Sequence, residues 1–437
     1  MSEKRKIVLL VSFLIFAFLL PLSGKDEMPS ILSMRERNAV VNNLLKIRLE
    51  TLLPELMRQQ NFDMWVVICR EYNEDPVFFS LVPYNSLAAR RLTMLVFYDR
   101  GDKGVERLAV SRYGIRDFYE GVWQPEKIEQ WECLAKVIKE RNPKRIGINE
   151  SDTFAFGDGL SSSLKKKLLR ALGPEYSSRL HSAEKLAVGW LERRIPEELE
   201  IYPHIVAIAH RIIAEAFSRE VITPGVTSTQ DVSWWIRERF RELRLGNWFH
   251  PSVSIQRSKK SKSSGDTILR GDLLHCDIGI TYLRLNTDTQ EHAYVLREGE
   301  TDAPQGLKEA LEVGNQAQDI LIAEFKEGRT GNEILAAALK KAKEAGLKAS
   351  IYSHPLGFHG HGAGPTIGLW DNQVNVPGKG DYRLYYDTCY AIELNIRTNL
   401  AEWGGQEIRI ALEQDGAFTR KGVHFIDGRQ TKFHLIK

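Results

Sequence analysis

Three short segments in the C-terminal half of the chain each set one carboxylate against a row of apolar side chains. These segments are residues 273–280, 389–396 and 407–413, and their carboxylates are Asp277, Glu393 and Glu413. Side chains alternate between the two faces of a β-strand, so the apolar rows would build a core while the acids gather on the opposite face. A single acid on an amphipathic strand is usually only solvated, but its repetition on three strands favours a shared site.

A fourth carboxylate and several small residues strengthen this interpretation. A turn follows the first strand, and a hairpin would bring Asp288 back beside Asp277. Gly279, Ala391 and Ala411 would leave room above the sheet. Carboxylates crowded in this way repel one another unless they are protonated or bridged by a cation. An oxygen-rich cage completed by an imidazole suits Mn(II), Co(II) or Zn(II), and shared acids would bridge a metal pair.

A glycine-rich segment supplies the imidazoles. Residues 353–365 contain His354, His359 and His361, which are three of the eleven histidines in the chain. A lone histidine is more often a structural residue, whereas three so close together favour a site.

Length and composition limit the remaining possibilities. The chain has 437 residues, which exceeds what one hydrophobic core usually organises, so two domains are expected. A formal charge of +3 from 60 basic and 57 acidic residues gives no reason to expect nucleic acid as a partner. The four cysteines have neither metal-type spacing nor the pattern of a disulfide framework, and buried free thiols are expected.

The N-terminus has the pattern of a signal peptide, which we predict over residues 1–24. Basic residues at positions 4–6 precede an uncharged apolar run over 7–22. We therefore expect export to a periplasmic or extracellular location, with no stable membrane insertion after cleavage. An uncleaved membrane anchor remains an alternative.

Two domains follow, over residues 25–190 and 191–437. The first alternates helical patterns, such as 41–59, with strand-like runs at 64–69, 92–98 and 145–148, and predicts a small α/β domain. None of these runs leads into a glycine-rich phosphate loop or a nucleophile elbow, so we expect no chemistry there. The second opens near Pro196 and carries helical patterns at about 195–220, 228–243, 303–327 and 331–345.

The order of the acids and the histidine resembles the pita-bread metallopeptidases, which include aminopeptidase P, prolidase and methionine aminopeptidase, with creatinase as a metal-free relative. The resemblance covers about residues 195–425. It implies an α+β fold with a pita-bread catalytic domain, preceded by a smaller α/β domain of the creatinase type. It also implies two divalent metal ions, Mn first with Zn or Co as alternatives. Their ligands would be Asp277, Asp288, His361, Glu393 and Glu413.

Two histidines of the proline-directed members are missing from their usual positions. Those members have a His-Tyr pair upstream of the first metal Asp, where this chain has a lysine- and serine-rich loop around Lys260. With His361 as the metal ligand, the His-Glu or His-Asp pair that the family carries roughly seven or eight residues further on is also absent. His359 and His354 are therefore the candidates for proton transfer or substrate contact.

The resemblance implies a peptidase that removes an N-terminal residue, with proline in the second position. A hydroxide that bridges the two metals would attack the scissile carbonyl, and Glu393 would carry the proton to the leaving nitrogen. The expected partner is a peptide substrate, and a homodimer is a family expectation. Two alternatives stay open, namely hydrolysis of a non-peptide amide or amidine, and a secreted binding module without catalysis.

Overall fold

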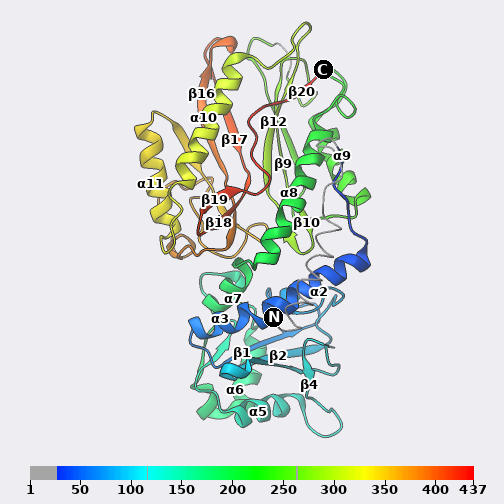
Figure 1. Cartoon of the computed structure of the whole chain (residues 1–437), viewed down its shortest axis with the longest axis vertical. Coiled ribbons are helices and arrows are strands. Elements are labelled where there is room, and N and C mark those ends of the chain that lie inside the picture. Colours follow the sequence, from blue (N-terminus) through cyan, green and yellow to red (C-terminus); the bar gives the residue numbers. More distant parts are fainter. Residues whose placement is uncertain (1–26, 116, 262–263) are drawn as a thin grey trace, which may run out of the picture. The chain divides into compact units, whose positions relative to one another are not determined.

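The computed structural model describes residues 27–115, 117–261 and 264–437 (Figure 1). The chain divides into two compact units, one from Leu32 to Ile195 and the other from Pro196 to Lys437 together with the described residues up to Ile31. The division therefore lies slightly after the predicted position of 190, because helix α7 (Glu184–Glu192) belongs to the first unit. The predicted signal peptide lies outside the described residues. Among the described helices, none has both the length and the apolar character needed to cross a bilayer.

The N-terminal unit is built on a mixed β-sheet. Its strand order in the described residues is β4-β3-β2-β1-β5-β6, with β1 antiparallel to β2 and parallel to β5. The strands are β1 (Met64–Arg70), β2 (Leu92–Asp99), β3 (Val105–Val110), β4 (Glu120–Gly121), β5 (Ile146–Ile148) and β6 (Leu180–Ser182). Strands β1, β2 and β5 confirm the three strand-like runs of the sequence.

Helices cover this sheet and close its core. They are α2 (Met34–Glu50), α3 (Leu52–Gln59), α4 (Phe78–Leu81), α5 (Gln130–Arg141), α6 (Ser162–Ser177) and α7. The predicted helical pattern at 41–59 is thus two helices that meet at Thr51. Apolar side chains of β1, β2, β3 and β5 pack with those of α5 and α6 in one buried cluster.

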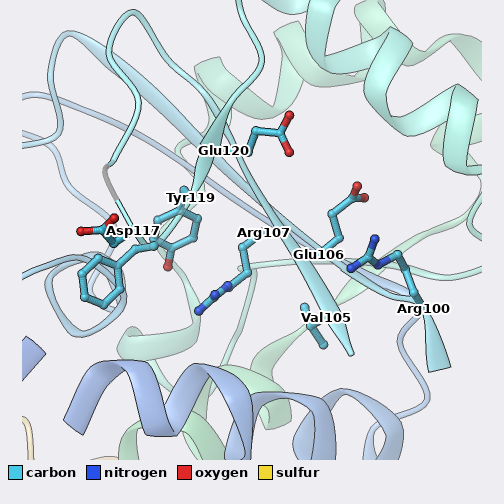
Figure 2. A pocket seen from close by; sticks show the side chains of 8 residues that line it. Arg100, Val105, Glu106, Arg107, Asp117, Tyr119 and Glu120 are labelled. Carbon is cyan, nitrogen blue, oxygen red and sulfur yellow. The ribbon is translucent and has the colours of Figure 1, made fainter. Parts of the chain in front are cut away.

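A pocket of about 410 Å³ opens in the N-terminal unit beside β3 (Figure 2). Its lining mixes both signs of charge, as Arg100 and Arg107 lie with Glu106 and Glu120. The groups of described residues that are able to hold a metal ion include none of these side chains. The pocket is therefore not the predicted centre, which has to be sought in the second unit.

The helices of the C-terminal unit agree with the sequence patterns. They are α8 (Pro196–Ala216), α9 (Thr229–Glu242), α10 (Gln305–Ile322) and α11 (Gly331–Glu344). Proline is favoured at the first position of a helix because its missing N–H has no partner there in any case. Ser228 and Thr330 each form a capping box with the acid three residues later, so the first turns of α9 and α11 begin where the sequence predicts.

In the described part of this unit, four small sheets position the acidic residues. The strands are β7 (Gly246–Asn247), β8 (Ser252–Gln256), β9 (Leu273–Ile278), β10 (Ile280–Tyr282), β11 (Leu285–Asn286), β12 (Thr289–Val295), β13 (Lys348–Ile351), β14 (His354–Leu356), β15 (Thr388–Ala391), β16 (Leu394–Leu400), β17 (Gln406–Leu412), β18 (Asp415–Thr419), β19 (Gly422–Phe425) and β20 (His434–Ile436). Their orders are β11-β10-β7, β20-β12-β9-β8, β13-β16-β17 and β14-β15-β18-β19. Helix α10 packs on β16 and β17 (Figure 1), where the apolar rows of 389–396 and 407–413 enter one core cluster. The apolar row of 273–280 is also buried, but it lies outside this cluster. This mixed architecture confirms the predicted α+β class.

One detail of the strand prediction is wrong. The segment 389–396 was expected as one continuous strand, but β15 ends at Ala391 and β16 begins at Leu394, and the two strands belong to different sheets. Glu393 therefore lies at a junction between sheets, and Glu413 lies directly after β17.

Candidate metal centre

The hairpin predicted from the sequence brings the first two acids together. Strands β9 and β12 are antiparallel, with Asp277 opposite Gln290, and Asp288 precedes β12 directly. The backbone N–H of Asp288 donates to Oδ1 of the buried Asp415 at 3.0 Å, which fixes the chain at this ligand position. Asp277, Asp288 and Glu413 form one group whose ligand atoms all lie within 4.8 Å of one another.

His354, the first residue of β14, also faces the acids. Its Nε2 lies 3.3 Å from Asp288 Oδ2, 3.5 Å from Glu413 Oε1 and 4.0 Å from Glu393 Oε2. The side chain of His354 is only 3 % exposed. One imidazole nitrogen thus faces three carboxylates in a buried space.

Three buried ligand atoms in this space form no hydrogen bond of good geometry among the described residues, although two of them, on His354 and Glu413, lie within ion-pair distance of each other. They are Asp277 Oδ1, His354 Nε2 and Glu413 Oε1. Buried polar atoms are almost always paired, because an unpaired one costs about 1–3 kcal/mol. Oxygen and imidazole donors that point into one buried space fit a divalent cation of the Mn, Co or Zn type.

The electrostatics of the acids lead to the same conclusion. Burial and the charge of Glu393 raise the pKa of Asp277 to about 7. Burial and the neighbouring acids also hold the pKa values of Asp288 and Glu413 well above their usual range. A bound cation would reverse this effect, since positive charge favours the ionised form of each acid.

The other two histidines of the glycine-rich segment lie differently. The ring of His361 is 4.6 Å from that of His354, and His361 joins a cation-compatible group only together with Asp288 and His354. His361 is exposed, whereas His354 is buried. His359 is a member of none of the three groups found among the described residues.

A tryptophan holds the exposed histidine in its position. The ring of Trp248 lies 4.9 Å from the ring of His361, and its Nε1 donates to the carbonyl of Thr287 at 2.9 Å. A Cβ atom added to Gly279 or Gly360 would overlap the indole. The space that Gly279 was expected to leave above the sheet is therefore filled by Trp248.

A family model of the metallopeptidase family M24 matches residues 204–422, which include the whole cluster. The chain belongs to metallopeptidase family M24. The sequence comparison with curated proteins finds no match. Solved structures with the same fold include an X-Pro aminopeptidase from Thermotoga maritima, with a TM-score of 0.62, 18% identity and coverage of 87% of this chain and 99% of that one.

Two structures from Bacillus anthracis are also similar to this M24 chain. An Xaa-Pro dipeptidase has a TM-score of 0.57 at 17% identity, covering 92% of this chain and all of its own. A putative aminopeptidase P has a TM-score of 0.60 at 12% identity, covering 88% and 96%. At these identities the likeness concerns the fold, which includes the creatinase-like N-terminal domain.

Sequence reasoning missed three residues that support the M24 centre. Gln290 lies between two of the acids, Asp415 holds the backbone of Asp288, and Trp248 packs on His361. Gln290 lies two positions after Asp288 on β12, so the alternation of side chains gave a signal for it. Trp248 and Asp415 are supplied by contacts that are distant in sequence and left no local pattern.

Proposed function

We propose that the protein is a dinuclear metal-dependent peptidase that removes an N-terminal residue ahead of proline, as an aminopeptidase P or a prolidase does. The observation that carries the proposal is the convergence of unpartnered ligand atoms of Asp277, His354 and Glu413 in one buried space. The proline preference is supported by the names of the solved structures with the same fold. Mn is the first candidate metal, with Zn or Co as alternatives.

We propose that His354, rather than His361, is the imidazole ligand beside Asp277, Asp288, Glu393 and Glu413. His354 lies within 4.0 Å of three carboxylates and is buried. With His354 as the metal ligand, the second histidine that the family pattern places after the ligand is no longer missing. His361 follows His354 by seven positions, which is the spacing expected for the second histidine.

Each residue of the centre has its own proposed role in the reaction. When bound, divalent cations in such a cage supply an activated water and positive charge opposite the developing oxyanion. Glu393 lies at the edge of the cluster, with Oε2 4.0 Å from His354 Nε2, and is proposed to take and return a proton during the reaction. The exposed ring of His361, supported by Trp248, is proposed to contact the substrate at the mouth of the site.

Metal analysis and a peptide panel test the proposal. Purified protein reconstituted with Mn, Zn or Co should hold about two equivalents of metal, and less than about one equivalent would rule out a catalytic centre of this kind. The loaded protein should release a free amino acid from Xaa-Pro dipeptides or tripeptides. Metal uptake without such release would instead support the hydrolysis of a non-peptide amide or amidine. Glu393→Gln should lower turnover strongly, and an unchanged rate would remove Glu393 from proton transfer.

A pair of substitutions tests the exchange of the two histidines. His354→Gln should lose metal, because it removes a buried ligand atom that faces three acids. His361→Gln should keep the metal content of the wild type and lose activity. The reverse result, with metal lost only in H361Q, would restore the ligand set that the sequence predicted. His359→Gln is the matched control and should keep its metal.

Export and association stay predictions. Export is supported by the basic and apolar pattern at the N-terminus of the sequence. N-terminal sequencing of the secreted or periplasmic protein tests it, and an intact N-terminus in the membrane fraction would favour the anchor. A homodimer is testable by light scattering.

A further inference from the structure

Gln290 connects two acids of the proposed metal centre. Its side chain lies on β12 and the residue is 4 % exposed. Its Nε2 donates to Glu393 Oε1 at 3.0 Å and to Glu413 Oε2 at 2.8 Å. The backbone of Gln290 also pairs with that of Glu413, since its N–H donates to the Glu413 carbonyl at 3.0 Å.

A histidine fixes the direction of this amide. The Oε1 atom of Gln290 lies 2.9 Å from His275 Nε2, which is the donor of this pair because the amide oxygen only accepts. A flipped amide would turn its oxygen towards two carboxylates and its N–H group towards the donor of His275. The three contacts therefore define one orientation.

The amide leaves each glutamate with one oxygen for the cluster. Gln290 binds Oε1 of Glu393 and Oε2 of Glu413, while the remaining oxygens of these acids are the ones that face His354. The free Oε1 of Glu413 is also one of the unpartnered ligand atoms. Holding one oxygen of each acid orients the other before any ion arrives, which lowers the cost of ordering two side chains on binding.

We propose that Gln290 is a positioning residue that presets Glu393 and Glu413 for a divalent cation, and that His275 presets Gln290. This inference rests on the proposed function, because it assumes that the cluster binds metal. Groups that orient metal ligands usually contribute about 10- to 100-fold in affinity. The same range is expected for Gln290, which contacts two ligands at once, and a smaller effect is expected for His275.

Metal affinity of the full chain tests the proposal without any activity measurement. The apparent Kd for Mn(II) and for Zn(II) is measured by competition with a chromophoric chelator, and Co(II) absorption spectra report the ligand geometry. Gln290→Met removes both donors at similar volume and should raise the Kd about 10- to 100-fold. His275→Phe should raise it in the same direction, and His275→Gln, which keeps an N–H donor, should recover part of the loss.

The matched control is Gln430→Met. Gln430 is also buried, and its side chain bonds to the backbone N–H and carbonyl of His292, which lies on β12 as Gln290 does. Within the described part of the chain, the side chain of Gln430 makes no hydrogen bond to the acids of the centre. Q430M should lower thermal stability and leave the Kd within about twofold, which separates a local effect on the ligands from a general loss of packing. If Q290M does not fold, Gln290→Asn serves instead, because its shorter side chain cannot reach both acids.

The possible outcomes distinguish the two proposals. A folded Q290M or Q290N with the Kd and the Co(II) spectrum of the wild type would overturn the role of Gln290 and leave the proposed metallopeptidase intact. A wild-type protein that takes up no metal would overturn both. Weak binding in Q430M equal to that in Q290M would also overturn the specific role of Gln290.

Discussion

His292 should make the C-terminal unit sensitive to mild acid. Its ring is fully buried between β9 and β17, where Nδ1 lies 3.0 Å from the Leu274 carbonyl and Nε2 accepts the backbone N–H of Ala411 at 3.1 Å. Nδ1 must therefore carry the single proton of a neutral ring. A second proton, on Nε2, would displace the bond from Ala411 and leave a charge in the core. The ring of His292 should therefore take up its second proton only when the unit unfolds.

The magnitude follows from the pKa of the ring. Burial, with a contribution from His275, lowers the pKa of His292 to about 3, compared with about 6.5 in an unfolded chain. Because the folded pKa is depressed, stability is complete above pH 6.5 and falls as the pH drops, since the unfolded chain takes up the proton first. The loss is about 1.4 kcal/mol per pH unit, or about 2 kcal/mol between pH 7 and pH 5.

Urea unfolding at pH 7 and pH 5, in the presence of a chelator, measures this effect. His292→Gln keeps a donor and an acceptor but does not titrate, so its free energy of unfolding should fall by about 2 kcal/mol less than that of the wild type over this range. The absolute stability of the variant does not enter the comparison. H424Q, at an exposed position, is the matched control. If H292Q lost as much stability between the two pH values as the wild type, the buried neutral ring would not be the cause.

Three further predictions concern packing, a buried ion pair and the metal. Gly360→Ala should cost about 1–3 kcal/mol in thermal unfolding, because its methyl group would overlap Trp248. Gly114→Ala is the control, since its methyl group meets only ordinary contacts and the variant should be nearly neutral. Equal losses of stability in the two variants would contradict the packing of Trp248 on Gly360. Arg257→Met should cost about 3–5 kcal/mol in urea unfolding, because it leaves the carboxylate of Asp272 without its charge partner. Asp272 is 1% exposed and lies 2.6 Å from the guanidinium of Arg257. A loss below about 1 kcal/mol would show that the pair contributes little. Removing metal from the loaded protein should lower the Tm reversibly in calorimetry. If the ion had been present at 100 times its Kd, the loss of stability should be about 2.7 kcal/mol. An unchanged Tm would contradict a cation site.

The acids of the centre were predictable because their signal is local. Asp277, Glu393 and Glu413 each stand opposite apolar neighbours, and alternation along a strand needs only a few consecutive residues. The same holds for the helix starts at Ser228 and Thr330, where the cap and its acid are three positions apart. Asp288 required one further step, the hairpin that returns β12 beside β9.

Strand alternation could not choose among the histidines, although the seven-residue spacing from His354 to His361 held a signal for the proposed exchange. His354 and His361 lie in one glycine-rich segment, and the different roles proposed for them depend on which ring meets Asp288, Glu393 and Glu413 in the fold. Periodicity also did not reveal that the chain changes sheets at Glu393, because the apolar row of Tyr390, Ile392, Leu394 and Ile396 continues across the break. Trp248 fills the space above Gly279 from a loop distant in sequence, and only the tertiary structure identifies it.

Strand β12 is completely buried, yet four of its residues in a row are polar. Three of them have their own distant partners, since Gln290 binds two acids, Glu291 binds His434 and His292 binds β17. A slip of one residue would turn each side chain to the opposite face and bury several polar groups without partners, at about 1–3 kcal/mol each. The strand therefore specifies its register by hydrogen bonding, and its polar composition makes it a poor nucleus for aggregation while the chain is still unfolded.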